Sequence, residues 1–136
     1  METLTIENPD EKDTKPIEEG VMQYGVLQVG GETPRKWAFH IKDKDKLIGG
    51  ATGRDHFTQF YLDNIWVKEE YRSLGIGERI HKDVVACAEK CGCNRILLST
   101  LNRRALKFYR KLGYEHLAVI EEYVIGFNLI YMEKKI

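Results

Sequence analysis

The stretch IWVKEEYRSLGIGERI, residues 65–80, carries the pattern that decides the fold. Its first residues are β-branched or aromatic, which predicts a strand, and its last residues open an apolar repeat with helical spacing. Between them Arg72, Gly75 and Gly77 form the motif R-x-x-G-x-G. A strand that runs through a glycine-rich turn into a helix is typical of an anion-binding loop.

The two glycines explain why such a loop suits an anion. They place no Cβ between the backbone and a bulky ligand, and the first amides of the following helix have no intrahelical acceptor. The loop therefore predicts a diphosphate site, although a plain chain turn also uses glycine. A dinucleotide fingerprint is excluded because Ile80 stands where a third small residue is required. A triphosphatase loop is excluded because no Gly-Lys-Ser/Thr follows.

Outward from this loop, strands and helices alternate along the chain. Strand, helix and strand over residues 60–100 require a parallel crossover, whereas the flanking hairpins are antiparallel. We predict one α/β domain over residues 1–136, with a mixed, mostly antiparallel central sheet and helices on both faces. The predicted strands are residues 4–6, 37–41, 47–51, 60–67, 95–100, 114–123 and 127–135. Three helices are predicted: one from Pro16 to Gly30-Gly31, one from Ile76 to Gly92 and one from Ala105 to Gly113.

Composition excludes several classes of function. Lys plus Arg and Asp plus Glu both number 21, so the net charge is +0 and no nucleic-acid partner is expected. There is no run of 18 apolar residues and the first residues are polar, so neither a membrane span nor a secretory signal is expected. Cys87, Cys91 and Cys93 form a poor disulfide framework, which favours a cytoplasmic location. They also lack the further ligands of a zinc site, so we expect no metal and interpret them as small buried hydrophobes.

The motifs together resemble the GNAT superfamily of N-acetyltransferases, which use acetyl-coenzyme A. The resemblance rests on residues 65–80, RILLST at 95–100, ALKFYRKLGYE at 105–115 and EEYVIGFNLIYMEKK at 121–135. It covers residues 47–135 well and the first 46 residues only by the order of elements. It implies a GNAT-like acyl-CoA N-acyltransferase fold, in which a splayed pair of parallel strands opens a cleft for the thioester.

The resemblance also implies which residues bind the coenzyme. Backbone amides of the glycine-rich loop would hold its pyrophosphate, and the strand before the loop would offer backbone groups to the pantetheine arm. A polar residue after the next strand would hydrogen-bond the pantetheine amides. By position these residues are Arg72, Ser73, Leu74, Gly75, Ile76 and Gly77 for the loop, Ile65, Trp66 and Val67 for the strand, and Asn102 for the polar contact.

Tyr109 stands where the family has a tyrosine that protonates the departing coenzyme A thiolate, and a phenol suits this task at neutral pH. It also shares a helix face with apolar residues, so packing is the alternative. For the base that takes a proton from the amine, Asp63 is the candidate, directly or through water, with Asp55 and His56 as others. A structural role for Asp63 remains open. The amide of Val67 would hold the oxyanion.

We therefore expect an acetyl-CoA-dependent N-acetyltransferase that moves acetyl to a primary amine by direct attack in a ternary complex. The acceptor is a small amine, an amino acid or a protein amine, and the sequence does not choose among these. A non-catalytic acyl-CoA-binding or sensing domain is the alternative, and an interaction module without a cofactor is another. The resemblance also allows a homodimer through the C-terminal hairpin.

Overall fold

The structure is a computed structural model, and it describes residues 1–30 and 32–136. The side chains of Val26 and Leu27 and the predicted helix stop at Gly31 lie outside the described residues. The chain forms two compact units, Met1–Thr33 and Pro34–Ile136, and each is described by itself. A single domain over residues 1–136 therefore stays a prediction.

The first unit contains helix α1 (Glu11–Val29), which starts earlier than the predicted Pro16. Asp10 explains the start, because its carbonyl oxygen accepts hydrogen bonds from the amides of Asp13 and Thr14. The Asp13 carboxylate in turn accepts a bond from the amide of Asp10 at 3.2 Å. The Asp13 carboxylate thus caps the start of α1, and Pro16 lies inside the helix.

The predicted strand at residues 4–6 is wrong. Residues 1–10 contain no strand, and the side chains of Leu4 and Ile6 are exposed. A strand needs a neighbour to complete its backbone hydrogen bonds, and the described residues of this unit provide none. An alternation of only two apolar residues was too short to indicate a strand.

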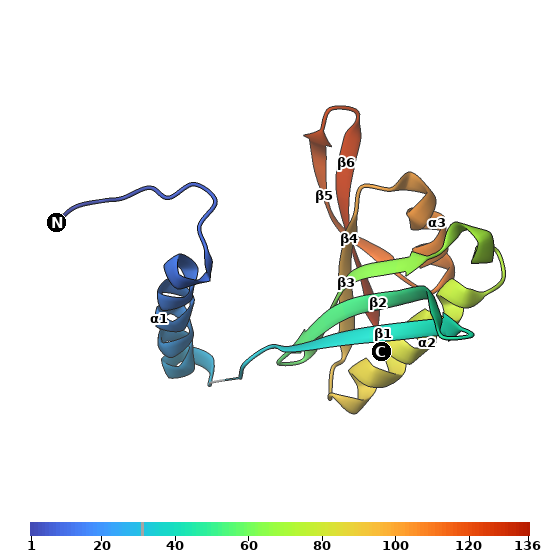
Figure 1. The fold of residues 1–136 in the computed structure, drawn as a ribbon, viewed down its shortest axis with the longest axis horizontal. Helices are drawn as coiled ribbons and strands as arrows, with labels where there is room; N and C mark the ends of the chain where they lie inside the picture. Colours follow the sequence, from blue (N-terminus) through green and yellow to red (C-terminus); the bar gives the residue numbers. More distant parts are fainter. Residues whose placement is uncertain (31) are drawn as a thin grey trace. The chain divides into compact units, whose positions relative to one another are not determined.

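The second unit contains a six-stranded sheet with the order β1-β2-β3-β4-β6-β5 (Figure 1). The pair β3/β4 is parallel and all the other pairs are antiparallel, which confirms the predicted mixed, mostly antiparallel sheet. The strands are β1 (Arg35–Asp43), β2 (Lys46–His56), β3 (Gln59–Val67), β4 (Arg95–Thr100), β5 (Glu115–Val124) and β6 (Phe127–Lys135); the helices are the short η1 (Glu69–Tyr71), α2 (Ile76–Lys90) and α3 (Arg103–Lys111).

The parallel pair holds together at one end only. Gln59, Phe60 and Tyr61 of β3 pair with residues 95–97 of β4, and the pairing then stops although both strands continue. The edge of β3 beyond Tyr61 is thus without a strand partner on the β4 side. This is the predicted splay, and it leaves a gap between the two strands.

The core lies between the sheet and helices α2 and α3, which share one cluster of buried side chains. Phe60 and Ile96 fill its centre from the joined part of β3 and β4, and Val84 and Tyr109 reach it from the two helices. Because α1 belongs to the other unit, helix coverage of the opposite face of the sheet stays a prediction.

The β5–β6 hairpin extends beyond the rest of the sheet (Figure 1). Every residue of β5 is exposed, although the strand is rich in apolar side chains. Among the described residues, none of the helices has the length and apolar character that a bilayer crossing requires.

Candidate active site

The loop between β3 and α2 is held by side chains that it carries itself. Nε of Arg72 donates to the carbonyl oxygen of Val67 at 3.0 Å, which ties the start of the loop to the end of β3. The hydroxyl of Tyr71 donates to the carboxylate of Asp43 at 2.8 Å and anchors the same segment to β1. The loop is therefore fixed before any ligand arrives.

Gly75 ends the loop and precedes the first turn of α2. Its φ of +77° lies in the left-handed region, which glycine adopts without a steric penalty. The first helical bond runs from the amide of Arg79 to the carbonyl of Gly75, at 3.1 Å. The amides that precede Arg79 in this first turn have no intrahelical acceptor and lie at the positive end of the helix dipole.

Gly77 is needed for a different reason. A Cβ at this position would lie 3.1 Å from the ring of Phe108 on α3, which is closer than an ordinary contact. The missing side chain lets α3 approach the first turn of α2. The two helices and the end of β3 thereby surround one hollow.

This hollow is a cavity of about 500 Å³ beside the open edge of β3. It brings together most of the residues predicted to contact the coenzyme, whereas Leu74, Gly75 and Ile76 do not line it. Sequence reasoning missed Ala105 and Phe108. The lining residues are Ile65, Trp66, Val67, Arg72, Ser73, Gly77, Asn102, Arg104, Ala105, Phe108 and Tyr109.

Tyr109 combines burial with an unused hydroxyl. The residue is 8% exposed, and its ring packs edge-on against Phe108 and Tyr114, with ring centres 5.4 and 5.5 Å away. In the part of the chain that the structure describes, its hydroxyl has no hydrogen-bond partner. Burial raises the pKa of Tyr109 above its ordinary value, so the phenol keeps its proton at neutral pH.

Asn102 has a structural task in addition to the predicted ligand contact. Its side-chain oxygen accepts a hydrogen bond from the amide of Arg104 at 2.9 Å and caps the start of α3. The side-chain NH₂ group is not used in this cap. Asn102 also lines the cavity, so this NH₂ is available as a donor there.

Asp63 is the extra residue of a β-bulge. Thr52 of β2 pairs with Asn64 and Gly53 pairs with Leu62, so Asp63 has no partner across the ladder. A bulge of this kind redirects side chains, and that of Asp63 lines a second cavity of about 370 Å³ between β3 and β4. The residues around this cavity are Arg54, Tyr61, Leu62, Asp63, Leu97, Leu98, Ser99, Leu117 and Tyr131.

Asp55, another candidate base, lies elsewhere. It pairs with Phe60, at the other end of β3 from Val67 and thus on the order of 20 Å from the loop. Its carboxylate is 1% exposed and accepts hydrogen bonds from Arg35 at 2.9 Å and from Trp37 at 2.6 Å. Burial would raise the pKa of Asp55, but these hydrogen bonds outweigh it and hold the pKa below its ordinary value. Asp55 therefore serves to join β1 to β2.

His56, the third candidate, follows Asp55 at the end of β2 and lines neither cavity. The three cysteines lie along α2 and just after it, away from both cavities. Cys93 is buried and Cys87 and Cys91 are half-buried against the core. Burial and the neighbouring Cys91 raise the pKa of Cys87 to about 11, so its thiol is protonated at neutral pH. Among the described residues, no group of three or more metal-ligating side chains could hold an ion.

A buried pair behind Tyr109 escaped the sequence analysis. A 2.8 Å hydrogen bond joins Nε2 of His81 on α2 to the hydroxyl of Tyr114, and both residues are buried. Burial, helped by the positive charge of Lys134, lowers the pKa of His81 to about 4, so the imidazole is neutral. The 33 residues that separate the pair leave no pattern that would connect them in the sequence.

Comparison with known proteins gives matches to acetyltransferases. A thialysine N-epsilon-acetyltransferase from Bos taurus is 43% identical over 63 residues, which cover 45% of this chain and 37% of that protein. The corresponding enzyme from Sus scrofa is 40% identical over 72 residues, with 52% and 40% coverage. The chain thus spans about two fifths of the length of these relatives.

Solved structures show the same fold. An acetyltransferase structure from Agrobacterium tumefaciens superposes with a TM-score of 0.93 over 100% of both chains at 23% identity. A streptothricin acetyltransferase structure from Bacillus anthracis, in complex with acetyl coenzyme A, gives a TM-score of 0.70 at 23% identity, over 77% of this chain and 65% of that one. The model of the acetyltransferase (GNAT) family matches residues 2–114. The chain therefore belongs to the GNAT acetyltransferase family.

Proposed function

We propose that this protein is an N-acetyltransferase that moves the acetyl group of acetyl-coenzyme A to a primary amine by direct attack in a ternary complex. The observation that carries the proposal is one continuous arrangement. A fixed glycine loop and helix start lie next to an unpaired strand edge, and a buried phenol with a free hydroxyl faces the same cavity.

The residues of the first cavity fit the coenzyme. Amides of the loop and of the first turn of α2 would hold the pyrophosphate, with Arg72, Ser73 and Gly77 facing it. The open edge of β3 at Ile65, Trp66 and Val67 would pair with the amides of the pantetheine arm as a further strand would. Leu74, Gly75 and Ile76 would contribute backbone groups only.

Three groups of the chain would act in the transfer. The amine nitrogen attacks the thioester carbonyl carbon, the C–S bond breaks, and the hydroxyl of Tyr109 donates its proton to the departing thiolate sulfur. Asp63 accepts the proton that the amine loses, directly or through a water molecule. The amide of Val67 would stabilise the negative charge on the carbonyl oxygen. The products are the acetamide and coenzyme A.

The acceptor is proposed to be a small-molecule amine. The similarity to thialysine N-epsilon-acetyltransferases supports a small molecule, and the second cavity, at about 370 Å³, has a volume that suits one. A protein amine is the other candidate that the sequence allows.

The experiment follows the release of free thiol from acetyl-coenzyme A over a panel of amines. The wild type is expected to release thiol with at least one acceptor, and Tyr109→Phe to lower kcat about 100-fold or more. Calorimetry should find the same affinity for acetyl-coenzyme A in both proteins. Tyr123→Phe, on the exposed hairpin, is the matched control.

The alternative, a domain that binds or senses acyl-coenzyme A without catalysis, predicts heat of binding and no thiol release with any amine. A third outcome, no heat and no shift of the melting temperature, would favour an interaction module and contradict the proposal.

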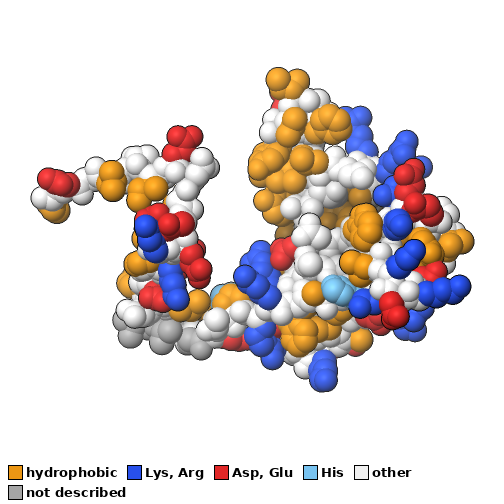
Figure 2. Space-filling view, in the orientation of Figure 1, with side chains coloured by type: hydrophobic (Ala, Val, Ile, Leu, Met, Phe, Trp, Pro, Cys, Tyr) orange, Lys and Arg blue, Asp and Glu red, His pale blue; other side chains and the backbone are white. Residues whose placement is uncertain are grey.

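We further propose a homodimer formed through the C-terminal hairpin. Figure 2 shows apolar side chains gathered on the projecting hairpin. A large exposed apolar surface on a folded protein is typical of an association surface. The exposed apolar residues are Leu117, Val119, Ile120, Tyr123, Val124, Ile125, Phe127 and Tyr131.

A cytoplasmic location is also proposed. Its support is the free state of Cys87, Cys91 and Cys93, since thiols persist in a reducing compartment. Fractionation of cells that produce the protein would test it.

A further inference from the structure

We infer that the acceptor is a primary amine with a carboxylate within a few bonds of the reacting nitrogen, and that Arg54 binds this carboxylate. The inference rests on the proposed function and names the substrate class of its acceptor side. It starts from the second cavity, between β3 and β4, where one positive and one negative side chain lie next to each other.

The charged pair in this cavity is weakly held. Nε of Arg54 lies 3.3 Å from Oδ2 of Asp63, and the two side chains are 44% and 40% exposed. An ion pair with this much contact with water contributes about 0–1 kcal/mol to stability. A ligand can therefore replace either partner at a small free-energy cost.

Arg54 is also oriented in advance. Its guanidinium carbon lies 4.4 Å from the centre of the Tyr61 ring, and stacking on an aromatic face restricts the side chain. Among the described residues, only Nε of this guanidinium takes part in a hydrogen bond, and the bond goes to Asp63. The two terminal NH₂ groups remain to bind a carboxylate through two parallel hydrogen bonds.

The short distance between the charges of Arg54 and Asp63 limits how far apart the two charges of a ligand can be. Asp63 attracts the ammonium form of the acceptor and Arg54 attracts an anion, so both are satisfied by a molecule whose own charges are neighbours. A plain amine would satisfy Asp63 alone, and a diamine would bring its second positive charge towards Arg54.

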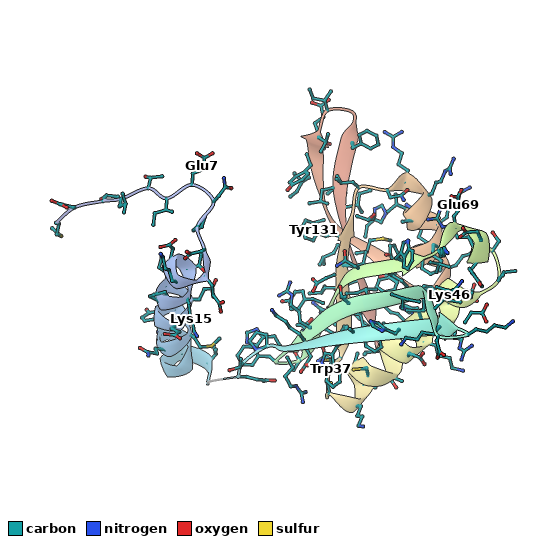
Figure 3. All side chains as sticks on the ribbon, viewed as in Figure 1. Glu7, Lys15, Trp37, Lys46, Glu69 and Tyr131 are labelled. Atoms are coloured by element: carbon teal, nitrogen blue, oxygen red, sulfur yellow. The ribbon has the colours of Figure 1, made fainter. Side chains whose placement is uncertain are left out.

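The remaining walls suit a small organic acceptor. Leucine side chains contribute apolar surface, and besides the charged pair the polar groups of the lining are the hydroxyls of Ser99, Tyr61 and Tyr131. Tyr131, labelled in Figure 3, lies on β6 opposite Ser99 of β4. The cavity is lined by residues of both β3 and β4, next to the gap where their pairing stops and where the proposed thioester site begins.

The test compares kcat/KM, from thiol release, for amino acids and for amines without the carboxylate: glycine with methylamine, β-alanine with ethylamine, and putrescine as the diamine. The wild type is expected to have a kcat/KM about tenfold or more higher for the carboxylate member of each pair, which corresponds to about 1.4 kcal/mol. Putrescine is expected to be the poorest acceptor. Arg54→Gln should raise KM for the amino acids about tenfold more than it raises KM for the plain amines, so the carboxylate preference is lost.

The matched control is Lys36→Gln. Lys36 pairs with Arg54 across the β1–β2 ladder, so the substitution removes a neighbouring positive charge. Lys36 itself does not line the cavity. The preference for carboxylates should survive this change. Arg54→Lys should restore the preference in part, because the charge returns without the planar fork.

Two outcomes would overturn the inference while the proposed function stands. In the first, the wild type acetylates plain amines as well as it does amino acids. In the second, Arg54→Gln lowers kcat/KM for every acceptor by the same factor, which would show that Arg54 acts on Asp63 or on the fold. Absence of thiol release with all acceptors would instead contradict the proposed function itself.

Discussion

At the scale of single residues, the two glycines of the R-x-x-G-x-G loop do different work. Gly75 has a left-handed backbone conformation, and a Cβ added there would have no other atom within 4 Å. Gly77 has an ordinary helical conformation, and its missing side chain leaves room for the ring of Phe108. The sequence predicted both as parts of an anion loop. It did not separate them, because the distinction depends on α3, about thirty residues later in the chain.

This difference leads to opposite effects of an added methyl group. Gly75→Ala should destabilise the protein by about 1 kcal/mol through backbone strain, without changing any contact. Gly77→Ala should displace Phe108 from the cavity wall and raise KM for acetyl-coenzyme A more than Gly75→Ala does. Denaturant unfolding and initial rates would measure the two effects. An unchanged KM in Gly77→Ala would contradict the assigned role of Gly77.

His81 predicts a pH dependence of stability. Its pKa is lowered to about 4 in the folded protein, against an ordinary 6.5, so between these values the unfolded chain binds more protons than the folded one. Stability should therefore be constant above about pH 6.5 and fall as the pH drops towards 4, by about 3 kcal/mol. Urea unfolding at several pH values would measure this fall.

The slope with pH, rather than the absolute stability, identifies the group. His81→Phe should flatten the slope between pH 6.5 and 4 even if the variant is less stable overall. His40→Gln, at an exposed position, should leave the slope unchanged. A wild-type protein with constant stability down to pH 4.5 would contradict the buried neutral imidazole.

At the scale of elements, the sequence predicted the long periodic segments best. The strand at residues 95–100 and the helix from Ile76 have the expected bounds to within a residue, because each carries a full apolar pattern. The strand at residues 4–6 was wrong, and α1 starts at Glu11, where the carboxylate of Asp13 accepts a hydrogen bond from the amide of Asp10. The bulge at Asp63 was not predictable, since one unpaired residue leaves no mark in composition.

Asn102 allows capping and ligand contact to be measured separately. Asn102→Ala should remove the cap of α3 and destabilise the protein by about 1 kcal/mol, and it should also raise KM for acetyl-coenzyme A. Asn102→Ser keeps a capping oxygen but loses the NH₂ group, so stability should be close to that of the wild type while KM still rises. If the serine variant matches the wild type in both measurements, Asn102 is a cap only.

At the scale of the whole molecule, the proposed coenzyme side of the site was more predictable than the proposed acceptor side. The loop, β3 and Tyr109 occupy continuous motifs, so a reader of the sequence can find them. The proposed acceptor cavity combines Arg54, Tyr61 and Leu117 from three separate strands. Their proximity follows from sheet order and from where β3 leaves β4, and neither is encoded in local spacing.

The proposed dimer would be held together by the exposed apolar side chains of the β5–β6 hairpin. Charges placed on the apolar hairpin, as in Val119→Asp with Ile125→Asp, should produce monomers, because an association surface does not tolerate unpaired buried charge. Light scattering would compare the variant with the wild type. Leu47→Asp, an exposed leucine outside the hairpin, is the control. A wild-type protein that is monomeric at micromolar concentration would contradict the proposal.

The single seam of three residue pairs between β3 and β4 has a mechanical consequence. Backbone hydrogen bonds link strands β1 to β3 in one half of the sheet and β4 to β6 in the other, and only this seam connects the halves within the sheet. A small rotation of one half of the sheet against the other about this seam would change the distance between the separated ends of β3 and β4. It would change the geometry of the three paired residues far less. The width available to a longer acyl chain should therefore be adjusted by side chains at the seam, such as Phe60 and Ile96, rather than by those at the opening.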